Sequence, residues 1–223
     1  MVWDWPLRIW HWLFALCLAG SWATAELGYD VREWHMRLGY LALALIAFRL
    51  CWGVLGNRYA RFSAWWPAPS RLRDYLVALR SPDTPVSAGH SPLGGLATWV
   101  LLVLVSIQAA TGLFADDEIL YTGPYAGALS GGWSDWLNDL HHSHFDWLLA
   151  AVVLHVLAIT AYRVLKGHRL VRAMVTGRAP VAPQAEAHTP PLWRILLAIV
   201  IAVGALWLLL QLAPEPSLDD YFY

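Results

Sequence analysis

The chain has 223 residues, of which 58% are hydrophobic and only 14% charged, and it contains 15 tryptophans. Soluble domains carry about 25% charged residues, so this composition excludes a water-soluble globular domain and predicts an integral membrane protein. The two cysteines, Cys17 and Cys51, both lie in apolar segments, and no CxxC or CxxCH motif occurs. This excludes a covalent c-type haem and a cysteine zinc site within the chain.

Five apolar segments are each long enough to cross a bilayer, whose hydrocarbon core is about 30 Å thick. They occupy residues 7–26, 34–56, 93–114, 144–165 and 192–212. We therefore expect an all-α fold, an integral membrane helical bundle. A Pro- and Ala-rich stretch at 181–191 has no periodicity, which indicates a linker. It would divide the chain into a membrane domain at 1–180, an additional transmembrane helix at 192–213 and an external tail at 214–223.

Charge is distributed unevenly among the connections. Residues 57–92 contain five arginines, and residues 166–191 contain three arginines and one lysine. Residues 115–143 contain five carboxylates and neither lysine nor arginine. The positive-inside rule then predicts a cytoplasmic N-terminus and a periplasmic C-terminus. Topology accounts for the basic connections, so we expect membrane lipid as a partner and no nucleic acid.

Two features of the first basic connection indicate local structure. Residues 70–80 place apolar side chains at helical spacing between arginines, which predicts a short amphipathic helix on the membrane surface or a solvated linker helix. Ser91 followed by Pro92 is a typical helix start, with a capping serine and a proline in the first turn.

Ionisable residues inside membrane spans are costly and by default suggest function. Four histidines lie in or beside such spans: His11 in the first, His35 in the second, and His141 and His155 framing the fourth. In the predicted topology His11 and His155 lie near the inner side, and His35 and His141 near the outer side. Two sites with two imidazoles each follow. Neutral nitrogen ligands in an apolar environment favour haem over a bare metal ion. The alternative is that these histidines hydrogen-bond neighbouring helices or lie at the level of the lipid headgroups.

The histidines of residues 140–155 differ in the helix face that they occupy. His141 and His155 are fourteen residues apart, which leaves them about 40° from alignment with an axial separation of ~21 Å. His142 lies about 140° from that face. His144 is only about 20° from the azimuth of His155, at an axial separation of ~16 Å. Spacing alone therefore leaves His144 open as the outer ligand.

Several small and basic residues lie near these histidines. Gly39 follows His35 by one turn, and its missing Cβ would let a flat macrocycle approach the backbone. Arg8, Arg37 and Arg49 could each pair with a haem carboxylate or extend to the membrane interface. We expect the remaining histidines of the inner connections to be solvated: His90, His168 and His188.

Five stretches resemble motifs of one known family. They are WDWPLRIWHW at 3–12, HMRLGY at 35–40, GHSPLGG at 89–95, ATGLFADDEILYTGP at 110–124 and LVRAMVTGR at 170–178. They make residues 2–180 similar to the bacterial cytochrome b561 and nickel–iron hydrogenase b-type cytochrome group. Its fourth helix carries two haem histidines fourteen residues apart, which selects His141 and His155 here. The resemblance implies four haem-binding transmembrane helices and two non-covalent b haems, with iron held by His11, His35, His141 and His155.

The resemblance also implies electron transfer. The first hypothesis is a di-haem b-type cytochrome of the bacterial inner membrane. It would carry electrons between the quinone pool and a periplasmic redox partner such as a c-type cytochrome. The alternatives are a superoxide:quinone oxidoreductase and a membrane anchor and electron-transfer subunit of a hydrogenase. The sequence leaves open whether the protein is itself an enzyme, such as a quinol:cytochrome c oxidoreductase, with quinone or quinol as its substrate.

Overall fold

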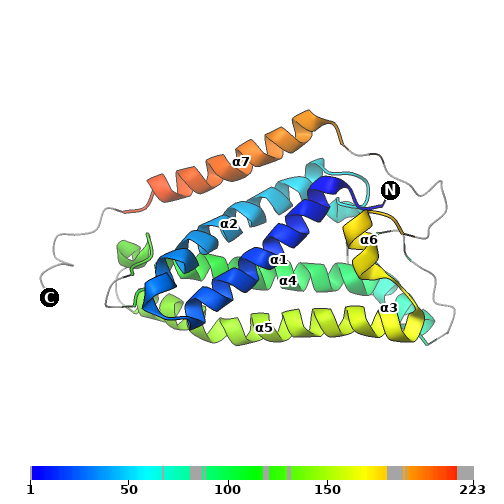
Figure 1. Cartoon of the computed structure of the whole chain (residues 1–223), viewed down its shortest axis with the longest axis horizontal. Coiled ribbons are helices and arrows are strands. Elements are labelled where there is room, and N and C mark those ends of the chain that lie inside the picture. Colours follow the sequence, from blue (N-terminus) through cyan, green and yellow to red (C-terminus); the bar gives the residue numbers. More distant parts are fainter. Residues whose placement is uncertain are drawn as a thin grey trace, which may run out of the picture.

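The structure is a computed structural model that describes residues 2–66, 68–80, 87, 89–117, 121–129, 132–179, 188 and 190–214. In Figure 1 the long helices run side by side along one axis, and no β-strand occurs among the described residues. The protein is an all-α membrane helical bundle, as the sequence predicts.

Five long helices form the bundle. They are α1 (Trp5–Glu26), α2 (Arg32–Leu55), α4 (Pro92–Thr111), α5 (Trp133–Lys166) and α7 (Leu192–Gln211). Two shorter helices are α3 (Pro69–Ala78) and α6 (Leu170–Thr176). Single 3-10 turns are η1 (Tyr29–Val31), η2 (Phe62–Ala64), η3 (Gly112–Phe114) and η4 (Ala126–Ala128). Helix α2 packs against α1 and α7, and α4 packs against α5.

Among the described residues, four segments are long and apolar enough to cross a membrane: Tyr29–Leu55, Pro92–Phe114, Trp133–Lys166 and Leu192–Gln211. Helix α1 has a sufficient length of 22 residues, but Arg8, His11 and several tryptophans lower its mean hydropathy. It nevertheless packs along α2 inside the bundle (Figure 1).

Helix α5 begins well before the predicted span at 144–165. Its 34 residues start at Trp133, and Asp135 lies in its first turn. A carboxylate at that position stabilises the helix by interacting with the positive end of its dipole. The polar residues 133–143 fall outside an apolar window, so hydropathy alone could not find this start. The longer helix places both His141 and His155 on one continuous element.

Side-chain caps fix two helix starts. The Ser91 hydroxyl accepts a hydrogen bond from the Gly94 backbone N–H at 3.1 Å, with Pro92 in the first turn, which confirms the predicted cap. The Asp4 carboxylate caps α1 in the same way, accepting from the Leu7 N–H at 3.0 Å. Each cap satisfies a backbone donor that the helix itself leaves unpaired.

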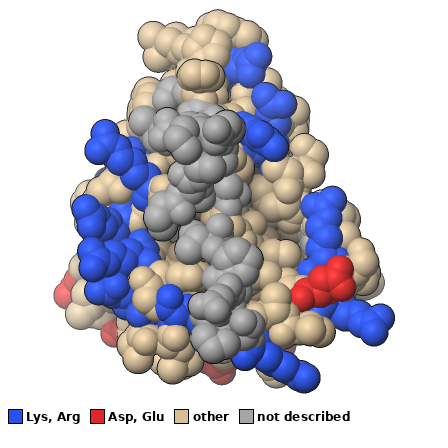
Figure 2. Space-filling view, turned by 90° about the vertical axis from the view of Figure 1, so that its right-hand side faces the viewer, with Lys and Arg blue, Asp and Glu red and all other residues tan. Residues whose placement is uncertain are grey.

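Helix α6 closes one end of the bundle. The N-terminal segment binds to Gly177, the residue that follows this helix. The Gly177 carbonyl accepts hydrogen bonds from the Val2 N–H at 2.9 Å and the Trp3 N–H at 3.3 Å. The Arg8 guanidinium also donates to the Val175 carbonyl. We call the end that contains residues 2–4, α3 and α6 the basic end. Figure 2 views this end, where Lys and Arg are prominent and few Asp or Glu are visible.

The outer surface of the bundle is apolar. Leu16, Val164 and Leu165 are 70%, 74% and 76% exposed, which is typical of side chains that face lipid. Helix α7 lies at the edge of the bundle beside α2 (Figure 1) and buries the small residues Ala198 and Ala202. His188, in the predicted linker, is exposed. Residues 180–187 and 189 of the linker region and 215–223 of the tail lie outside the described residues.

Candidate cofactor sites

The histidines that sequence places near the outer side come together in the structure. His35 on α2 and His141 on α5 have ring centroids 6.2 Å apart and rings at 83°. The Nδ1–H of His35 donates to the Ser21 carbonyl at 2.8 Å. A histidine held this way through Nδ1 presents Nε2 to a ligand, which is the usual arrangement of metal-binding imidazoles.

His141 is held by α4. Its Nδ1–H donates to the Gln108 carbonyl at 3.0 Å, and the Gln108 side-chain amide donates to the His141 carbonyl at 2.7 Å. The Thr111 hydroxyl lies 3.3 Å from the same Nδ1. Gln108 was not among the predicted site residues. A polar side chain in the last turn of an apolar span was the signal that could have found it.

The neighbouring histidines of α5 face elsewhere. The His144 Nδ1–H donates to the Gln108 side-chain oxygen at 3.0 Å, and this imidazole is buried. His142 is exposed. It is His141 that contacts the His35 ring. The position of His144 against α4 favours His141 as the partner of His35.

The inner histidines gather toward the basic end. His11 on α1 and His155 on α5 lie close enough to interact electrostatically. His90, in the connection before α4, lies near them: burial lowers its pKa to about 3, and the positive charge of Arg49 acts in the same direction. The three histidines of this inner group come from α1, α5 and the connection before α4, and they interact electrostatically.

The prediction that His90 is solvated is wrong. Its ring packs between Trp65, with centroids 4.4 Å apart, and Trp3, with centroids 4.8 Å apart. The reason is local backbone geometry. Gly89 has φ +86°, and a Cβ there would come within 2.8 Å of Tyr59 Cδ1. This close turn directs the next residue into the bundle, and the glycine before the histidine was the available signal.

Arg49, on α2, contacts the same Trp65 ring as His90 does. Its side chain is only 1% exposed, and its guanidinium carbon is 4.6 Å from the centre of the Phe62 ring and 5.6 Å from those of Trp10 and Trp65. No described residue hydrogen-bonds any of its three guanidinium nitrogens. Aromatic faces offset part of the cost of burying a cation, but the unused donors remain costly. An anion would satisfy them.

The other two predicted arginines are engaged at the surface. Arg8 donates to the Val175 carbonyl of α6. Arg37 pairs with Glu33 at 2.5 Å, its guanidinium lies over the Trp34 ring, and both members of the pair are exposed. The buried arginine of α2 is therefore the candidate that faces the inner group.

Residues 2–177 match the family model for prokaryotic cytochrome b561. The chain belongs to this family. Three similar proteins are each named a probable nickel–iron hydrogenase b-type cytochrome subunit. The one from Azotobacter chroococcum mcd 1 is 28% identical over 79% of this chain and 86% of its own length. Those from Escherichia coli K12 and Cupriavidus necator are 25% and 26% identical over 79% of this chain, and over 88% and 85% of their own lengths. No solved structure matches the chain.

Membership in the cytochrome b561 family makes this protein a membrane b-type cytochrome, and b-type cytochromes contain haem b. The residues present fit this group. Imidazoles of neutral character suit haem iron, and the buried, unpaired guanidinium of Arg49 suits a propionate carboxylate. A Cβ built at Gly39 would meet nothing within 4 Å, so the backbone one turn after His35 borders open space.

Gly112 gives room to a proposed ligand, which leads to a test. A Cβ there would lie 2.8 Å from His141 Cε1. We expect Gly112→Ala to displace the His141 ring and weaken binding of the outer haem about 10- to 100-fold, as loss of supporting contacts does at metal sites. Haem titration of the purified protein measures this. Gly204→Ala is the control, because a Cβ there meets nothing within 4 Å. Equal haem affinity in both variants would show that Gly112 does not position His141.

Proposed function

We propose that this cytochrome b561 family member is a di-haem protein that carries electrons between the quinone pool and a redox partner. One haem b would bind between His35 and His141, and the other between His11 and His155. The observation that carries the proposal is that α5 contributes one histidine to each group, and that α2 and α1 contribute the partners.

The chain's own residues supply support and orientation. The bound haems would supply iron that takes up and releases single electrons. Carbonyls of Ser21 and Gln108 accept from Nδ1 of His35 and His141, which fixes the ring orientation and raises ligand basicity. Arg49 would hold a propionate and stabilise its charge away from water. The exposed apolar surface keeps the helices in lipid.

We propose that the basic end faces the cytoplasm and that the C-terminus is periplasmic. The arginines around α3 and α6 support this orientation, because basic residues are retained on the cytoplasmic side (Figure 2). A reporter enzyme fused after Leu212 is expected to be active in the periplasm. Activity of the same fusion only in the cytoplasm would reverse the assignment of inner and outer sites.

A hydrogenase is the partner that the comparisons favour over a periplasmic c-type cytochrome. All three relatives above carry the name of a hydrogenase b-type subunit. We infer that this chain serves as the membrane electron-transfer subunit of such a complex. The inference is independent of the haem ligands, since a different docked partner would leave the two haem sites unchanged.

Spectroscopy on the purified chain tests the function. We expect two haems b per chain by pyridine haemochrome assay, two midpoint potentials in a redox titration, and reduction of the haems by a ubiquinol or menaquinol analogue. One haem per chain would contradict the di-haem arrangement. Two haems without quinol reduction would leave the cofactor sites in place and refute the quinone step. Haem reduction by hydrogen in membranes with and without the hydrogenase separates that partner from an added cytochrome c.

A further inference from the structure

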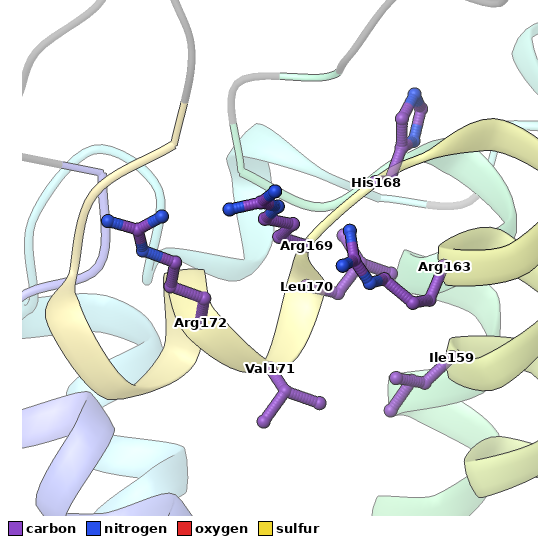
Figure 3. A pocket seen from close by; sticks show the side chains of 7 residues that line it. All are labelled: Ile159, Arg163, His168, Arg169, Leu170, Val171 and Arg172. Atoms are coloured by element: carbon purple, nitrogen blue, oxygen red, sulfur yellow. The ribbon is translucent and has the colours of Figure 1, made fainter.

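A cavity lies at the basic end, where α5 ends and α6 begins, apart from the histidine groups. This cavity of about 290 Å³ is lined by the side chains of Arg163, His168, Arg169, Arg172, Ile159 and Val171, together with the intervening leucine of α6. Figure 3 shows these side chains around the space between the two helices. None of them belongs to the histidine groups described above.

The backbone that forms this cavity is fixed at both ends. Gly167, with φ +69°, ends α5 in the left-handed conformation, and the next N–H, from His168, donates to the Tyr162 carbonyl at 3.1 Å. The His168 ring also stacks on Tyr162, so this histidine is half-buried and not freely solvated as predicted. At the far end of α6, Gly177 binds the N-terminal segment. The cavity is therefore a formed feature and not the gap beside a loose turn.

The charge around the cavity has one sign. In the described part of the chain no aspartate or glutamate forms an ion pair with Arg163, Arg169 or Arg172. Their guanidinium groups lie at one level in Figure 3. The positive-inside rule explains why this connection is basic, but it does not require three arginines to surround one cavity. Their mutual repulsion is relieved by an anion with several acceptor oxygens.

The opposite wall of the cavity is apolar. Ile159 lies one turn deeper in α5 than Arg163, and Figure 3 shows Ile159 and Val171 together below the arginines. The exposed apolar face of α5 continues beyond them through Val156 and Leu157, which are 56% and 59% exposed. A ligand that fits has an anionic head beside the arginines and a hydrocarbon chain along α5.

We propose that this cavity binds the phosphate of an anionic phospholipid, such as phosphatidylglycerol or cardiolipin, with an acyl chain along Ile159 and Val171. Inorganic phosphate shares the head chemistry but lacks the chain. Basic pockets at the cytoplasmic ends of membrane helices are known to suit such headgroups. The site does not depend on the haem assignment.

Binding to the full-length, detergent-purified and delipidated protein tests the proposal. Native mass spectrometry counts retained lipid, and the midpoint of thermal unfolding is followed with phosphatidylglycerol, phosphatidylethanolamine or inorganic phosphate. We expect phosphatidylglycerol alone to be retained and to raise the midpoint. Each arginine near a lipid surface contributes about 1 kcal/mol, so Arg163→Gln, Arg169→Gln and Arg172→Gln combined should weaken binding about 100-fold.

A matched triple variant on the neighbouring connection is the control. Arg71→Gln, Arg73→Gln and Arg80→Gln remove the same charge from the α3 region and should leave retention of the lipid unchanged. Should the pocket triple variant fail to fold, each single variant is expected to weaken binding about fivefold. Equal losses in the two triple variants would overturn the proposal in favour of general surface attraction. Equal stabilisation by inorganic phosphate would overturn the lipid as the ligand.

Discussion

Replacing His155 by alanine is expected to remove one of two haems from the purified protein. His155 is the contribution of α5 to the inner group, where it interacts with His11. In the proposed site these two imidazoles would hold the haem iron, and one of them alone would not retain it in an apolar environment. The pyridine haemochrome assay should fall from about two haems per chain to about one. His11→Ala is expected to produce the same loss, with the same spectral component missing.

The outer site and a neighbouring histidine provide the controls. His141→Ala should remove the other haem and leave the inner spectral component unchanged. His142→Ala alters an exposed residue on the same helix and should retain both haems. Loss of a haem in His144→Ala with full retention in His141→Ala would transfer the outer ligand to His144, which is held against Gln108.

Replacing Asp4 by alanine is expected to cause the largest loss of stability. The Asp4 side chain is 1% exposed and accepts from the Leu7 N–H at 3.0 Å, the Trp52 indole N–H at 3.2 Å and the Asn57 N–H at 3.3 Å. Alanine removes a helix cap and leaves buried donors without an acceptor. We expect the free energy of unfolding to fall by about 3–5 kcal/mol, measured from tryptophan fluorescence during denaturation.

The asparagine variant separates hydrogen bonding from charge. Burial raises the pKa of Asp4, although its three hydrogen bonds and the nearby Arg49 act in the opposite direction. A raised pKa means that burial disfavours the ionised form. The contribution of the Asp4 carboxyl to the free energy of unfolding is therefore largest at pH values below its pKa in the unfolded chain. It declines as the pH rises through the pKa that this group has in the folded protein. Asp4→Asn keeps an acceptor oxygen and should cost less than Asp4→Ala. Asp30→Ala, at an exposed position, should lie within about 0.5 kcal/mol of wild type. Equal losses in the two Asp4 variants would refute the role of the acceptor.

The sequence predicts the bundle well because apolar length is a local property. The expected spans agree with α1, α2, α4 and α7 to within a few residues, and the Ser91 cap was readable from two adjacent residues. The early start of α5 was missed, because a helix that continues in a polar environment carries no hydropathy signal.

The site was only partly predictable, because packing between distant segments decides it. Helical spacing and charge placed His35 and His141 at one level, and the structure brings their rings together. Three arginines looked equivalent in sequence, but only contacts with aromatic rings from a later connection distinguish Arg49. His90 was misassigned for the same reason: the tryptophans that enclose it stand at positions 3 and 65, far from it in sequence.

The bonds from Val2 and Trp3 to Gly177 set an order for biogenesis. Residues near position 2 leave the ribosome long before residue 177 does, so their backbone donors find these partners only after α5 and α6 have been synthesised. Residues 2 and 177 are also the first and last residues that match the family model. The unit that matches the family model therefore closes only once residue 177 has emerged, and α7, which follows it in the chain, packs on α2.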